Sequence, residues 1–195
     1  ADTITIPQPL SWIRSILLIL ALASQPMSAE YYTPDRLLNE LQDELAPWVR
    51  AQKGALSIAR DPFHFLELLA ESPAGWRAVL HWDGETNPAT EEQAGIFAPQ
   101  RLSIGLTANL GLTAAPDQAL VKATASRPAL LVLLAGLRER VRGYVWPEGI
   151  TNRFTLYTGC EPVILPEPAM PLAAYRLNFE LIIALPPAEY RNLLT

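Results

Sequence analysis

Residues 101–110, R-L-S-I-G-L-T-A-N-L, decide the class of fold. Apolar residues alternate with polar or small ones along the stretch, which is the period of a β-strand with one buried face. The apolar positions are Leu102, Ile104, Leu106, Ala108 and Leu110. The other face of this strand carries Arg101, Thr107 and Asn109, and we expect those side chains to face solvent.

The same alternation occurs in other parts of the chain. It predicts strands over residues 76–82, 154–165 and 175–183. Asp83-Gly84 predicts a turn after the first of these strands, and Thr158-Gly159 interrupts the second. Residues 63–70 fit either a strand or a short helix.

Two segments carry apolar residues at helical spacing. Thr33 can cap a helix that begins at Pro34 and continues to Val49. Pro47 is expected to kink or end this helix, and Gly54 to close the segment. A second helix opens near residues 126–128 and runs to about residue 142, where its arginines suit the negative end of the helix dipole.

Strands that alternate apolar and polar residues, interrupted by a helix, indicate an α+β fold. We predict an antiparallel or mixed sheet of about four strands, with helices packed on one face. A chain of 195 residues suits one such domain, over residues 30–195, preceded by an apolar segment over residues 1–29.

The apolar run Ile13–Ala23 has two interpretations. Small residues follow it up to Ala29, as at the cleavage site of a secretory signal. Residues 1–11, however, carry Asp2 and no lysine or arginine, whereas a signal has positive charge there. We favour a buried or interface helix over residues 10–24, in which Leu17, Leu18 and Leu20 need cover from a partner subunit. The run is far shorter than the roughly 20 residues that span a bilayer.

Residues typical of catalysis or metal binding are few. The chain has two histidines, His64 and His81, and one cysteine, Cys160, so no multi-cysteine site or internal disulfide can form. His64-x-x-Glu67 lacks the second histidine of a zinc helix, and there is no phosphate loop or nucleophile elbow. We therefore predict that the chain is not an enzyme and needs no cofactor.

The charge balance does not suit a nucleic-acid binder. The formal net charge is −5, from 15 basic and 20 acidic residues, and Lys53 and Lys122 are the only lysines. Nucleic-acid binding requires clustered cations that neutralise phosphates. Sequence-specific binding to DNA or RNA is not expected.

Three stretches together resemble tail-terminator and minor tail proteins of tailed phages. They are G-W-R-A-V-L-H-W-D-G at residues 75–84, the helix that begins R-P-A-L-L at residue 127, and the ending Y-T-G-C-E-P-V at residue 157 with Y-R-L-N-F-E-L at residue 175. In that family a Y-x-G-x-x-x-V hairpin leads into a last strand of the type Y-x-L-x-F-x-L. The resemblance covers about residues 75–185, and the apolar N-terminal segment departs from the pattern.

The resemblance implies a structural virion protein that is assembled in the host cytoplasm. Such proteins form rings, commonly hexameric, at the head-proximal end of the tail tube, where they stop tube polymerisation and meet the head-completion protein. DNA passes through the ring without specific binding, which suits a negative chain. The candidate contact residues are Leu17, Leu18, Leu20, Glu85, Glu91, Glu92, Arg101, Thr107, Asn109 and Arg153.

Two other interpretations stay open. The chain can be an exported bacterial binding or adaptor domain whose residues 1–29 are a signal peptide, in which case the mature protein begins at Glu30. It can also be an enzyme whose site is assembled from scattered residues, if a pocket collects His64, His81 and Cys160 within hydrogen-bonding distance.

Overall fold

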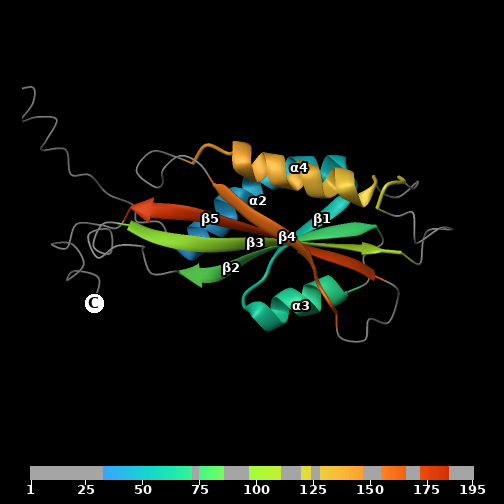
Figure 1. Ribbon diagram of the computed structural model, residues 1–195, viewed down its shortest axis with the longest axis horizontal. Coiled ribbons are helices and arrows are strands. Elements are labelled where there is room, and N and C mark those ends of the chain that lie inside the picture. The colour runs from blue at the N-terminus through green and yellow to red at the C-terminus, as the bar shows by residue number, and fades with distance from the viewer. Residues whose placement is uncertain are drawn as a thin grey trace, which may run out of the picture. The chain divides into compact units, whose positions relative to one another are not determined.

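The computed structural model describes residues 33–71, 75–85, 97–110, 120–123, 128–146, 155–165 and 172–184. The chain divides into two units, residues 1–30 and 31–195, and all described residues belong to the second. Their elements are, in order, α2 (Pro34–Ala51), β1 (Gly54–Ile58), α3 (Pro62–Ala70), β2 (Trp76–Glu85), β3 (Phe97–Asn109), α4 (Leu130–Gly143), β4 (Leu156–Pro162) and β5 (Leu172–Ala184) (Figure 1).

The strands form one mixed sheet in the order β1-β2-β3-β5-β4. β1 and β2 are parallel, while every other neighbouring pair is antiparallel. The parallel pair needs a crossover, and α3 supplies it. The predicted α+β fold is confirmed, with five strands in place of four. The additional strand is β1, which the sequence does not mark because five residues are too few to show a period.

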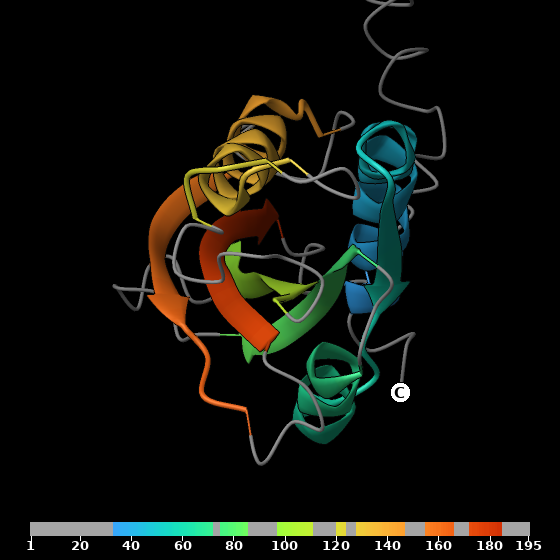
Figure 2. The same cartoon turned by 90° about the vertical axis from the view of Figure 1, so that its right-hand side faces the viewer.

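The helices lie on both sides of the sheet (Figures 1 and 2). α2 and α4 pack on one face, as predicted for the helices, and α3 covers part of the opposite face. No helix among the described residues has both the length and the apolar character that crossing a membrane requires.

The main core lies between the sheet and the helices α2 and α4. Leucines of both helices, such as Leu41 and Leu133, are fully buried against the sheet. Trp48 and Trp76 meet there edge to face, with ring centroids 6.0 Å apart. Gly136 of α4 leaves room for the indole of Trp48, because a Cβ at this position would lie 2.4 Å from that ring. The two tryptophans therefore fix how closely α2, α4 and β2 approach one another.

β3 is buried on both faces, which corrects the expectation of one solvent-facing side. Residues 102–109 are all buried. Gly105 lies directly under α3, since a Cβ at this position would come 2.7 Å from Cζ of Phe65 and 2.8 Å from Cδ2 of Leu69. The small and polar residues of this face therefore reflect a close approach of α3 and not exposure to water.

Local signals explain where several elements begin and continue. Residues 63–70 are helical because the Asp61 carboxylate accepts the His64 N–H at 2.8 Å and Pro62 occupies the first helical position. Thr33 caps α2 as predicted, but the helix does not end at Pro47 and continues to Ala51.

Two turn signals lie inside strands. The predicted turn at Asp83-Gly84 is wrong, because β2 continues through it with a bulge in which Gly84 has a φ of 108°. The predicted interruption of the later strand at Thr158 is confirmed as a register shift in β4.

The contact between α3 and β3 gives a test of the fold. We expect Gly105→Ala to lower the free energy of unfolding by about 1–3 kcal/mol, because the added methyl group overlaps Phe65 and Leu69. Urea unfolding followed by tryptophan fluorescence measures this. Gly159→Ala is the matched control, since a Cβ at Gly159 meets nothing within 4 Å. Equal stability of the two variants would contradict the described approach of α3.

Candidate functional site

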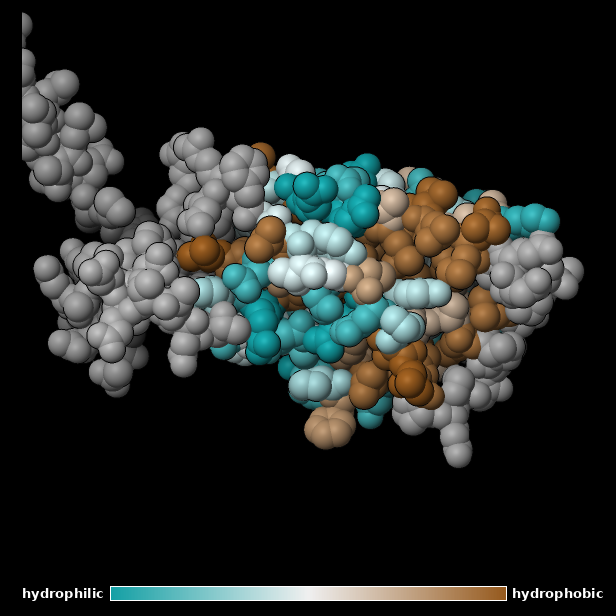
Figure 3. Space-filling view, in the orientation of Figure 1, coloured by the Kyte–Doolittle hydropathy of each residue, from teal (hydrophilic) through white to brown (hydrophobic). Residues whose placement is uncertain are grey.

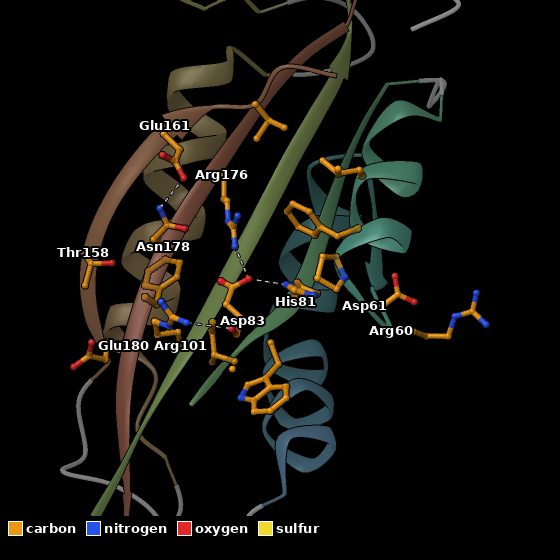
Figure 4. Close-up of a pocket in the computed structure, with 18 residues that line it drawn as sticks. Arg60, Asp61, His81, Asp83, Arg101, Thr158, Glu161, Arg176, Asn178 and Glu180 are labelled. Carbon is orange, nitrogen blue, oxygen red and sulfur yellow. Dashed lines mark hydrogen bonds and ion pairs between the residues drawn. The ribbon is translucent and has the colours of Figure 1, made fainter. Parts of the chain in front are cut away.

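A polar groove of about 830 Å³ opens on the α3 side of the sheet (Figure 4). The beginning of α3 forms one wall with Pro62 and Phe65, and residues from β4 and β5 form the other. The groove exists because α3 covers only part of this face, so that the outer strands remain uncovered. Its floor carries the ionisable residues His81, Asp83 and Arg176.

The Asp83 carboxylate is the centre of a hydrogen-bond network in the groove. Its Oδ1 lies 2.6 Å from Nδ1 of His81 and 3.2 Å from Oγ of Ser103, and it also accepts from Nη2 of Arg176. The Asp83 main-chain carbonyl accepts from Nη2 of Arg101 at 3.5 Å. One aspartate thus connects β2, β3 and β5.

The bulge in β2 places this aspartate. Trp82 pairs with Leu102 and Gly84 with Arg101, which leaves Asp83 as the extra residue without a partner across the strand pair. Bulges redirect side chains in this way. The positive φ of Gly84 permits the bulge, since most side chains are strained in that conformation.

The network also lowers the pKa of Asp83. Burial alone would raise the pKa of Asp83, but the hydrogen bond from His81 and the charge of Arg176 outweigh it and lower the pKa below its usual value of 3.8. Asp83 is therefore ionised at neutral pH and can only accept hydrogen bonds. It follows that the Nδ1–H group of the buried His81 donates the hydrogen bond that the Asp83 carboxylate accepts.

A histidine oriented by an aspartate is one part of several catalytic sites, but among the described residues the groove does not hold the other parts. Ser103 donates its hydroxyl hydrogen to Asp83, so the aspartate and not the imidazole is its partner. His64 and Cys160 do not line the groove. Nδ1 of His64 accepts from the Arg60 N–H at 3.1 Å.

Cys160 lacks the surroundings of an activated nucleophile. Partial burial, and secondarily the nearby Glu161 carboxylate, raise the pKa of its thiol. Reactive cysteines have the opposite shift, because the thiolate is the nucleophile. Among the described residues, no group of three or more histidine, cysteine, aspartate or glutamate side chains could hold a metal ion.

The predicted contact residues have different positions in the structure. Thr107 and Asn109 are buried, so their assignment to a contact surface is wrong; they lie on a central strand that is covered on both faces. Arg101 and Glu85 are exposed, and Glu85 accepts from Nε2 of Gln100 at 2.9 Å. The remaining candidates lie outside the described residues: Leu17, Leu18, Leu20, Glu91, Glu92 and Arg153.

Sequence reasoning missed the network itself. Asp83 and Arg176 are 93 residues apart, and Ser103 looks like an ordinary polar residue of a strand. The alternation places His81 and Asp83 on one face of β2, and Arg176 and Asn178 on one face of β5. Only the strand order brings these two faces together.

The groove gives a second test. We expect Asp83→Asn to lower the free energy of unfolding at pH 7 by about 2 kcal/mol, because two donors and the Arg176 charge lose their anionic partner. A lowered pKa contributes stability that is complete above the unfolded value and is lost as the pH falls through the folded value.

The difference between wild type and Asp83→Asn should therefore be constant near neutral pH and shrink below pH 3.8. Thermal or urea unfolding across this range measures it. Asp43→Asn, on the exposed side of α2, is the control and should change little at any pH. A difference that did not depend on pH would contradict an ionised Asp83 at the centre of the network.

Comparison with known proteins does not assign the chain to a family. No protein-family model matches the chain, and no curated protein matches it. Among solved structures, a histidine kinase from Burkholderia phymatum STM815 is 14% identical over 91% of this chain and 81% of that one, with a TM-score of 0.28. A protein from Akkermansia muciniphila, solved without its transmembrane region, is 11% identical over 87% and 97% of the two chains, with a TM-score of 0.29. Similarities at these scores do not bear on function.

Proposed function

We propose that this chain is a structural protein that acts by contacting other protein subunits, as a ring at the head-proximal end of a phage tail tube. There it ends polymerisation of the tube and joins the tail to the head-completion protein. The structural observation that carries the proposal is an exposed aliphatic surface at the beginning of α4. That the ring lies at the end of a tail tube is proposed from the resemblance of residues 75–185 to tail-terminator and minor tail proteins.

The aliphatic surface is made by Leu120, Val121, Leu131 and Val132. The main-chain N–H of Leu131 donates to the carbonyl of Leu120 at 3.1 Å. This hydrogen bond holds Leu120 and Val121 beside Leu131 and Val132. Val121 is 66% exposed, Leu131 51% and Val132 59%. Figure 3 shows apolar side chains gathered over this end of α4.

Such a surface favours a protein partner. Single apolar side chains are common on protein surfaces, whereas adjacent ones cost solvation free energy unless another molecule covers them. The inner side of the same helix is buried in the core through Leu130, Leu133 and Leu134. Leu131 and Val132 are therefore additional apolar residues that the described core does not use.

The charges of the chain suit a ring through which DNA moves without being held. The net charge is −5. Arginines gather at the end of α4, but Arg138 and Arg142 both pair with Glu139. A lumen that retained phosphates would need free clustered cations.

Leu131→Glu tests the aliphatic surface. Leu131 is the second residue of α4, where a carboxylate is favourable for the helix dipole, so we expect the variant to fold with unchanged stability. We expect it to lose at least about tenfold in ring assembly, as for a central apolar contact. Mass photometry and negative-stain microscopy of the full chain measure assembly.

Phe63→Glu is the matched control. Phe63 is also the second residue of its helix, α3, and is 80% exposed, but it lies outside the aliphatic surface. Its variant should assemble like the wild type. A wild-type chain that stays monomeric and is absent from tail particles would refute the proposal, and an intact mass that begins at Glu30 would favour an exported domain instead.

A further inference from the structure

We infer that neighbouring copies in the ring pair the β4 edge of one subunit with the β1 edge of the next, so that the sheet continues across the subunit boundary. This inference rests on the proposed ring and adds a contact between strand edges to the aliphatic surface at the beginning of α4. The observation behind it is that β1 and β4 are the two edges of the sheet. Among the described residues, no strand pairs with the outer side of either.

The backbone of β1 shows which groups face outward. The N–H of Ala59 donates to the carbonyl of Leu80 in β2 at 2.8 Å. Backbone groups in a strand point alternately to its two sides, so Ala55 and Ser57 also face β2. The N–H and C=O groups of Leu56 and Ile58 therefore point away from the sheet, where they need partners.

β4 has a matching outer edge. The N–H of Val163 donates to the carbonyl of Ala174 in β5 at 2.9 Å, so the residues in phase with it, such as Glu161, face β5. The backbone groups of Cys160 consequently point outward. Pro162 also lies on this side, and it contributes a carbonyl but no N–H.

The faces of the sheet fix how the two edges can align. Leu56 packs against the core beneath α2 and α4. Cys160 pairs across from Leu177, which is buried in the same core, so the two side chains share that face. If Leu56 pairs with Cys160, the outward backbone groups of the two strands meet, and both side chains lie on the same face of the continuous sheet. Ala55 then lies opposite Glu161.

Strand direction agrees with this alignment. β1 is parallel to β2, and three antiparallel pairings then lead to β4, so β4 runs opposite to β1. Copies related by rotation about an axis roughly along the strands keep their strand directions. The contact between β4 of one copy and β1 of the next is then antiparallel, which the alignment requires.

Opposite charges lie at one end of the two edges. The segments that lead into and out of β1 carry the exposed residues Arg50, Lys53 and Arg60. The β4 edge carries the exposed Glu161, and Glu180 of β5 pairs with Leu156 at its other end. In the antiparallel register Glu161 lies opposite Ala55, two residues from Lys53, whereas joining two β4 edges would bring two Glu161 side chains together. At the other end of β1 the exposed Asp61 follows Arg60, so the charge match concerns the Lys53 end alone.

Engineered disulfides test the contact. Ala55 and Glu161 would form a non-hydrogen-bonded pair, in which Cα atoms are about 4.5 Å apart and a disulfide can close. In a Cys160→Ser background, we expect the double variant Ala55→Cys/Glu161→Cys to give, after oxidation, a ladder of covalent multimers up to the closed ring. Each single-cysteine variant should give dimers at most, and a mixture of the two singles should give a crosslinked pair.

The control is Asp43→Cys/Glu161→Cys, which places an exposed cysteine on α2 in place of the one on β1. It should give no ladder. Rings seen by mass photometry together with no Ala55–Glu161 crosslink in either the double variant or the mixture would overturn the edge pairing and leave the proposed function standing. Absence of rings in the wild-type chain would instead overturn the proposed function and the edge pairing with it.

Discussion

The approach of α3 to Gly105 is the constraint on which the other features of the described fold depend. A helix can lie this close to β3 only where the strand has no side chain. The position of α3 makes β1 and β2 parallel neighbours, because a parallel pair requires a crossover that covers one face of the sheet. It also buries β3 on both faces and moves the edge of the sheet outward to β1.

The same position of α3 creates the polar groove. The helix covers the sheet only in part, so Asp83 and Arg176 meet at a half-buried position. The attraction between their opposite charges is stronger there than it would be in bulk water. The network gives the side chains of His81 and Ser103 an acceptor, while the buried Nε of Arg176 has no hydrogen-bond partner among the described residues. The Asp83 network in this groove holds three strands together, and the surfaces that we propose for partners lie at the sheet edges and at the beginning of α4.

The sequence predicts elements well where a long period or a cap marks them. Examples are the α2 helix with its Thr33 cap, the core strand predicted over residues 101–110 and observed as β3, and the interruption at Thr158. It fails where tertiary structure reverses a local signal: Thr107 and Asn109 are polar but buried, and Asp83-Gly84 forms a bulge instead of a turn. The groove could not be predicted, because Asp83 and Arg176 meet only through the strand order.

The central claim is that other subunits cover surfaces that the described part of one chain leaves exposed. An electron cryomicroscopy reconstruction of the assembled full-length chain tests it most directly. The account predicts a closed ring in which Leu131 and Val132 lie against a neighbouring protein. An assembly in which these two side chains remain in contact with solvent, or a preparation that holds only single chains, would contradict it.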